Sequence, residues 1–120
     1  MLKKEYDVEQ IDLISKFLFK ILFPKGFDAD KFTNFDFSEN FLDLKINLEN
    51  LILQNKFCEA EDLLFDQIEC NNSSRSILQL GVWFFWKLNS FNDEILRKNN
   101  YSRGEVLKGF EDIEKMVVEL

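Results

Sequence analysis

The chain has 120 residues, of which 46% are hydrophobic and 31% are charged, a composition typical of one globular domain. Its net charge of −7 disfavours nucleic acid and anionic membrane surfaces as partners, because both require a basic binding surface. The same acidity favours a soluble protein in the cytoplasm. One proline and four glycines are too few turn signals for a β protein, so we expect a single all-α domain over residues 1–120.

Apolar residues recurring at three- and four-residue intervals predict about six helices, at residues 5–23, 38–54, 57–71, 74–89, 91–99 and 103–118. The first helix is apolar around most of its circumference, so we expect burial on two sides, with Val8, Ile11, Ile14, Leu18 and Ile21 as its main stripe. The core-facing residues expected in the other long helices are Phe41, Leu44, Leu48, Leu51, Ile52, Phe57, Ala60, Leu64, Ile68, Ile77, Gly81, Phe84, Phe85, Leu88, Val106, Phe110, Ile113 and Val117.

The connections are marked by residues that favour turns and caps. Residues 24–37 alternate Phe with polar residues, which favours a loop pinned by its aromatic side chains and allows a short extended piece, with Asp36 or Ser38 capping the next helix. Asn55 is expected to end the second helix in a left-handed conformation. Ser73 or Ser74 should cap the fourth helix, and Ser102 followed by Glu105 fits a capping box.

Membrane and redox signals are weak. The most apolar run, residues 17–23, is too short to cross a bilayer and contains Lys20. If Cys58 and Cys70 share one helix, their separation of about 18 Å excludes a disulfide between them. We therefore expect two reduced thiols, as is usual in the cytosol.

A weak internal repeat links two parts of the chain. The residues 55–57 (Asn-Lys-Phe) recur as 89–91 (Asn-Ser-Phe), an offset of 34 residues, which is the period of the tetratricopeptide repeat. The segment 55–61 resembles the turn and second helix of that repeat, with Ala60 at its small position. Glu94 replaces this alanine in the second copy, so we expect one fair and one degenerate repeat, stacked as right-handed antiparallel hairpins.

Three segments together resemble a small bacterial family of unknown function. They are Lys-Glu-Tyr-Asp with the following apolar helix at 4–23, the motif Asn-Lys-x-x-Glu-Ala-Glu-x-Leu-Leu-Phe at 55–65, and Asn-Tyr-Ser-Arg-x-Glu-Val through Ile at 100–113. The likeness covers nearly the whole chain, and the last motif is its most specific part. It implies a compact helical fold and a bacterial cytoplasmic location, and it implies no chemistry.

Signals for catalysis are missing. The chain has no histidine, which removes the commonest general base and zinc ligand and excludes Ser–His and Cys–His pairs. Its carboxylate pairs, such as Glu59/Asp62, have helical spacing typical of solvated faces, and no phosphate-binding or calcium loop is present. We therefore expect no enzyme activity, no cofactor and no metal.

The remaining candidate is a surface. Trp83 and Trp86 lie three residues apart beside Lys87, and the repeat geometry would place them on the side of Glu49 and Ile52. Tryptophan is enriched at interface hot spots, so these five residues form a candidate partner site. The alternative is that both indoles belong to the core.

Two functions fit these patterns. The first is a non-catalytic helical module that binds a protein partner or a second copy of itself through an aromatic helix face. The second is a binding protein for small apolar ligands, with a Phe-lined pocket closed by the 24–37 loop.

Overall fold

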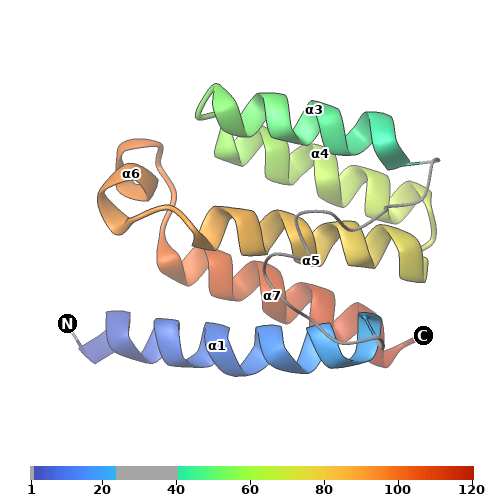
Figure 1. Ribbon diagram of the computed structural model, residues 1–120, viewed down its shortest axis with the longest axis horizontal. Coiled ribbons are helices and arrows are strands. Elements are labelled where there is room, and N and C mark those ends of the chain that lie inside the picture. Colours follow the sequence, from blue (N-terminus) through green and yellow to red (C-terminus); the bar gives the residue numbers. More distant parts are fainter. Residues whose placement is uncertain (1, 24–40) are drawn as a thin grey trace.

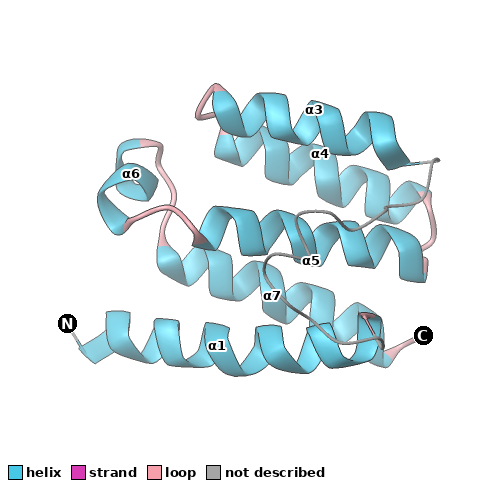
Figure 2. Cartoon of the chain, viewed as in Figure 1, coloured by secondary structure: helices cyan, strands magenta, loops and turns pink. Residues whose placement is uncertain are grey.

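The computed structural model describes residues 2–23 and 41–120, with side chains from Tyr6 onward in the first segment. These residues form six helices and no strand, which confirms the predicted all-α fold (Figure 2). The helices are α1 (Leu2–Leu22), α3 (Leu42–Leu53), α4 (Phe57–Cys70), α5 (Arg75–Asn89), α6 (Asp93–Lys98) and α7 (Arg103–Val118). The other helix ends lie within three residues of the predicted ranges, whereas the predicted start of the second helix at residue 38 lies outside the described residues. The predicted 24–37 loop with its caps Asp36 and Ser38 lies outside them as well.

The five long helices lie side by side in the spatial order α1, α7, α5, α4, α3, and the short α6 closes one end (Figure 1). α1 and α7 run in the same direction, antiparallel to α5, while α3 and α4 form an antiparallel hairpin. α5 is the central element, because it contacts α1, α7 and α4. α1 contacts α7 and α5 and forms one edge of the stack.

Burial follows the predicted faces in α3, α4, α5 and α7. All residues expected to face the core in these helices are buried except Leu51 and Phe41, which is next to α3; both are partly buried. Nine residues of α5, including Gly81, are buried, as expected for the most aromatic stretch of the chain.

The first helix departs from its predicted face. Ile11, Leu18 and Leu22 point into the core, whereas Val8 and Ile21 are 49% and 37% exposed. The expected burial on two sides is therefore wrong for α1 within a single chain. The reason is positional, since α1 lies at the edge of the stack and its neighbours within residues 2–23 and 41–120, α7 and α5, lie on one side of it.

Two glycines allow α5 and α7 to pack closely. A Cβ atom at Gly81 of α5 would lie 2.8 Å from Cδ1 of Ile113, which confirms the close helix contact predicted at this position. A Cβ atom at Gly109 of α7 would lie 2.1 Å from Cε1 of Phe85. Each helix therefore places a glycine where the other presents a large side chain.

The turns use the residues that the sequence singled out. Asn55 has a φ of 60° and ends α3 as predicted, and Asn100 has a φ of 58° after α6. Ser102 caps α7, since its Oγ accepts a hydrogen bond from the backbone N–H of Glu105 at 3.2 Å. The sequence left Ser73 and Ser74 as alternatives for the N-cap of α5, and Ser74 occupies that position.

The two repeat copies differ in the structure. Asn55 lies in a left-handed turn, whereas its counterpart Asn89 is still helical, and the helix that follows the second copy has only six residues against fourteen in α4. The paired residues Phe57 and Phe91 nevertheless contact each other, with ring centroids 5.2 Å apart. The helical arrangement is compatible with tetratricopeptide-like stacking, which stays a prediction.

Candidate functional site

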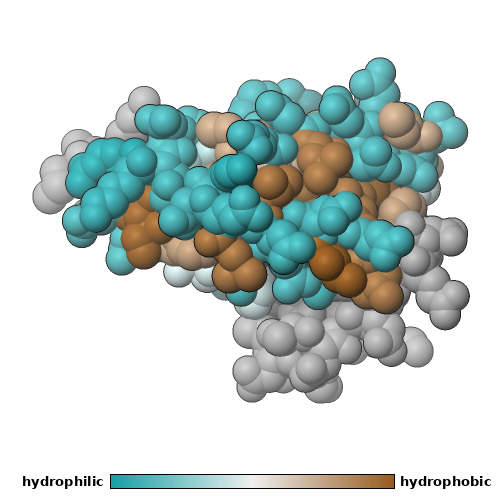
Figure 3. Space-filling model, turned by 90° about the horizontal axis from the view of Figure 1, so that it is seen from above, coloured by the Kyte–Doolittle hydropathy of each residue, from teal (hydrophilic) through white to brown (hydrophobic). Residues whose placement is uncertain are grey.

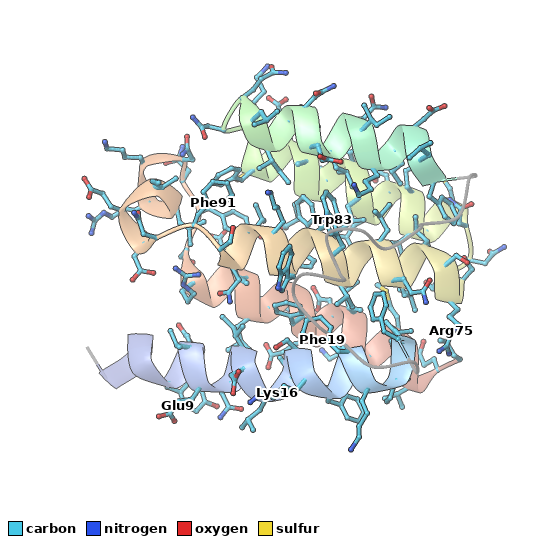
Figure 4. The ribbon with its side chains drawn as sticks, viewed as in Figure 1. Glu9, Lys16, Phe19, Arg75, Trp83 and Phe91 are labelled. Carbon is cyan, nitrogen blue, oxygen red and sulfur yellow. The ribbon has the colours of Figure 1, made fainter. Side chains whose placement is uncertain are left out.

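Trp83 belongs to the core of the protein. Its side chain is 4% exposed and lies between α5 and the α3–α4 hairpin (Figure 4). The ammonium of Lys45 on α3 sits 5.0 Å from the centre of its indole ring, a favourable cation–π distance, and the same ammonium pairs with Glu49 at 2.9 Å. The structure therefore links Trp83 to Glu49 through Lys45, and in this contact the indole anchors α3 to α5.

The other predicted partner residues do not share one surface. Ile52 is 2% exposed and packs in the core, so it is not accessible to a partner. Lys87 is partly buried in the last turn of α5, where its backbone carbonyl accepts hydrogen bonds from Ser90. Trp86 is partly buried and lines a groove shared with α1.

This groove, which we call the Trp86 groove, has a volume of about 350 Å³. It is lined by Val8, Ile11, Asp12, Ser15, Lys16 and Phe19 of α1 and by Trp86 and Asn89 of α5. Phe19 points from α1 toward the other helices, as Figure 4 shows. Lys16 and Asp12 form an ion pair at 2.9 Å on exposed parts of the wall. The groove is thus apolar around its aromatic rings and carries both signs of charge at its rim.

The sequence did not single out Arg103, which fixes the corner between α5, α6 and α7. Its guanidinium donates to the backbone oxygen and Oδ1 of Asn89 at 2.8 and 2.7 Å and to the backbone oxygen of Phe91 at 2.7 Å. It also pairs with Asp93 at 3.0 Å, and only 12% of its side chain is exposed. Because Asn89 also lines the Trp86 groove, Arg103 holds one end of that groove in place. Its sequence signals were its position beside the Ser102 cap and its place in the motif at residues 100–113.

A second polar cluster joins α4 to the start of α7. The hydroxyl of Tyr101 donates to the carboxylate of Glu61. Burial, followed by the Glu61 contact, raises the pKa of Tyr101, and burial raises the pKa of Glu61 against the opposing effect of the Tyr101 hydrogen bond. Both shifts arise where helices pack together, and neither group faces the Trp86 groove.

Cys58 lacks the low pKa of a reactive nucleophile. Cys58 and Cys70 are both free and exposed, as predicted for reduced thiols. Burial, together with the charge of Glu105, raises the pKa of Cys58, which lowers its thiolate fraction at neutral pH. A catalytic or redox-active cysteine requires the opposite shift.

Residues 2–23 and 41–120 contain neither a cluster suited to a metal ion nor a helix suited to a membrane span. No group of three or more Cys, Asp or Glu side chains there is arranged to hold a metal ion. Within the same ranges, no helix combines the length and the apolar character needed to cross a membrane.

Comparison with known proteins found one relationship. The model of a family of unknown function, DUF6483, matches residues 1–118. No curated protein and no solved structure matches the chain.

Proposed function

Because this chain belongs to the family of unknown function DUF6483, its activity must be inferred from its own surfaces, and we propose a non-catalytic helical protein–protein interaction module. The observation that carries this proposal is the partly buried Trp86 on the wall of an open groove. Its setting is the cytoplasm of a bacterium, as the sequence resemblance implies.

The composition of the groove supports a protein partner. Interface hot spots are enriched in tryptophan and cluster in partly enclosed pockets surrounded by polar residues. Trp86 and Phe19 provide the aromatic centre here, and Asp12, Lys16 and Asn89 provide the polar border. An amphipathic helix or an extended segment that inserts one or two apolar side chains fits this arrangement.

A small ligand is the second candidate. The groove volume of about 350 Å³ falls at the lower end of the range of small-molecule sites. Among the described residues, Phe19 is the only phenylalanine in its lining, so this pocket differs from the Phe-lined one expected from the sequence. Its polar border favours an amphipathic ligand over a purely apolar one.

The test uses the Trp86→Ala variant with Leu53→Ala as the control, since Leu53 is 80% exposed on α3, outside the groove lining. Proteins captured from a bacterial lysate by the wild-type chain are purified and titrated individually by calorimetry. We expect Trp86→Ala to weaken binding of the true partner at least about tenfold, as for a hot-spot tryptophan, and Leu53→Ala to leave it unchanged. Equal affinities of wild type and Trp86→Ala for every purified partner would refute the proposed site.

The ligand alternative is tested separately. In a Trp83→Phe background Trp86 is the only tryptophan, so its emission reports directly on the groove. Saturable quenching or shift of this emission by 1-anilinonaphthalene-8-sulfonate, together with a raised melting temperature, would favour a small ligand. No change in emission would leave the protein partner as the sole function proposed for this groove.

A further inference from the structure

The outer side of α1 carries an apolar stripe that the fold does not cover. Its members are Tyr6, Leu13, Phe17 and Ile21, which are 58%, 63%, 42% and 37% exposed. At 3.6 residues per turn they fall within about 80° of the helix circumference, roughly a quarter turn away from the core-facing Leu18. Gln10 occupies the remaining position, so no charged residue interrupts this α1 stripe.

The α1 stripe is separate from the face that holds α1 in the fold. Ile11, Leu18 and Leu22 are already 2%, 0% and 0% exposed against the rest of the protein. α1 also forms the edge of the helix stack, so no helix of the described residues lies on its outer side (Figure 1). A contiguous row of large exposed apolar side chains of this kind marks an association surface.

We propose that the α1 stripe pairs with the same stripe of a second copy of this chain, in an antiparallel, two-fold symmetric homodimer. The proposal rests on the interaction function proposed above, and it assigns a surface other than the Trp86 groove. It also explains why α1 is apolar around most of its circumference, since the second copy covers the side that one chain leaves exposed.

The charges bordering the stripe identify the occupant as a second copy. Glu9 and Lys20 are exposed and lie on the same outer border of the stripe, next to Leu13 (Glu9 is shown in Figure 4). They are equally distant from the junction of residues 14 and 15, which lies within one residue of the middle of the stripe. An antiparallel two-fold axis at this point places Glu9 of each copy opposite Lys20 of the other.

The same register pairs the apolar side chains. Tyr6 of one copy comes within a turn of Ile21 of the other, and Phe17 packs between Gln10 and Leu13. In a parallel two-fold pair this border of one copy would face the opposite border of the stripe in the other copy, so Glu9 and Lys20 would not meet. The charge pattern therefore selects the antiparallel arrangement.

The size of the stripe determines how strong the dimer is. It spans sixteen residues, or about 22 Å of helix, and one helix pair of this length buries less than the roughly 1,200 Å² of a standard interface. We expect a dissociation constant on the order of 10 µM, so the dimer must be sought at tens to hundreds of micromolar.

The first test is sedimentation equilibrium of the full chain over about 1–300 µM. The wild type should shift from the mass of one chain, 14.3 kDa, toward twice that mass. Phe17→Glu should remain monomeric over this range, while Leu53→Glu, at an exposed position of α3, should dimerise like the wild type. Figure 3 views the molecule from the side on which α3 lies. A wild type that stays at one chain mass, or a dimer lost in Leu53→Glu and kept in Phe17→Glu, overturns the proposal.

The second test exchanges the border charges, which are exposed. Glu9→Lys and Lys20→Glu should each weaken the dimer about tenfold, because each replaces two attractive contacts by two repulsive ones. The double variant Glu9→Lys/Lys20→Glu should recover affinity to within about threefold of wild type, because the opposite charges face each other again.

The alternative explanation of this charge pattern is the helix dipole, which favours acidic residues near the start of α1 and basic residues near its end. If the helix dipole alone explains these charges, exchanging both of them does not restore the affinity of the dimer, and the double variant dimerises at least as weakly as either single variant. This result would refute the antiparallel register. Trp86→Ala should dimerise like the wild type, so failure of the dimer and failure of the Trp86 groove are measured independently.

Discussion

At the scale of the residue, the contact between Tyr101 and Glu61 shows how burial decides the properties of a polar pair. Tyr101 is 3% exposed, and its hydroxyl donates to a half-buried carboxylate that connects α4 to the start of α7. Burial and the Glu61 contact together raise the pKa of Tyr101 above its ordinary value of 10.0. The folded state therefore keeps the tyrosine neutral where the unfolded chain ionises it.

This linkage predicts a loss of stability at alkaline pH. Below pH 10 the tyrosine is protonated in both states, and above it the unfolded state loses a proton that the folded state retains. The free energy of unfolding should therefore fall by up to about 1.4 kcal/mol per pH unit above pH 10 because of this one group. Urea denaturation between pH 8 and pH 11 should show a steeper decline for the wild type than for Tyr101→Phe, and parallel curves would contradict the assignment.

The residue scale also shows what sequence can and cannot predict about polar contacts. The local signals at Asn55 and Ser102 predicted a left-handed turn and a helix cap correctly, because the partners of both residues lie within a few positions in the chain. Arg103 and Tyr101 were not singled out, since their partners, Asn89 and Glu61, are 14 and 40 residues away and only folding brings them together.

At the scale of the element, the pairing of α5 with α7 depends on shape rather than on polar contacts. Gly109 of α7 lies directly against Phe85, which is fully buried and also contacts Phe84 and Phe110. Gly104, on the same helix, has no atom closer than 3.5 Å to an added Cβ. The two glycines of one helix therefore have opposite tolerance to a methyl group.

Alanine substitution at these two glycines should separate packing from helix propensity. Gly109→Ala should lower the free energy of unfolding by about 1–3 kcal/mol, because the added methyl group forces Phe85 out of its position. Gly104→Ala should change it by no more than about 1 kcal/mol, and in the stabilising direction, since alanine favours a helix. Thermal and urea denaturation measure both, and an equal effect of the two substitutions would contradict close packing at Gly109.

At the scale of the whole molecule, periodicity predicted the helices well because each long helix buries one regular face. The buried face of α4 was predicted residue for residue. In α7 all four predicted residues are buried, but Leu107 and Gly109, which were not predicted, are buried as well. The face of α1 was misassigned, because a helix with two apolar sides gives no periodic signal for which side meets the core. Only the stack, with α1 at its edge, shows that Ile11 and Leu18 face inward and Leu13 and Phe17 outward.

For the candidate site, too, the sequence pattern identified residues without showing which neighbours they face. The sequence identified both tryptophans, but their spacing of three residues could not separate their environments. Trp83 turns toward Lys45 and the core, whereas Trp86 turns toward α1 and the groove, a neighbour that lies some seventy positions away in the sequence. The repeat pattern pointed to α3 as the facing helix, and the structure adds α1 on the other side.

The central claim is that this protein acts through its surfaces and that its α1 stripe is the site of an antiparallel pair. Disulfide trapping tests it directly, in a chain with Cys58 and Cys70 replaced by serine and with Glu9→Cys and Lys20→Cys introduced together. Within one chain these positions are about 16 Å apart along α1, too far for a disulfide, so only a second copy can bridge them. Mild oxidation should give a covalent dimer from the double variant and far less from either single variant. Equal trapping of the single variants, or no covalent dimer at all, would contradict the pairing.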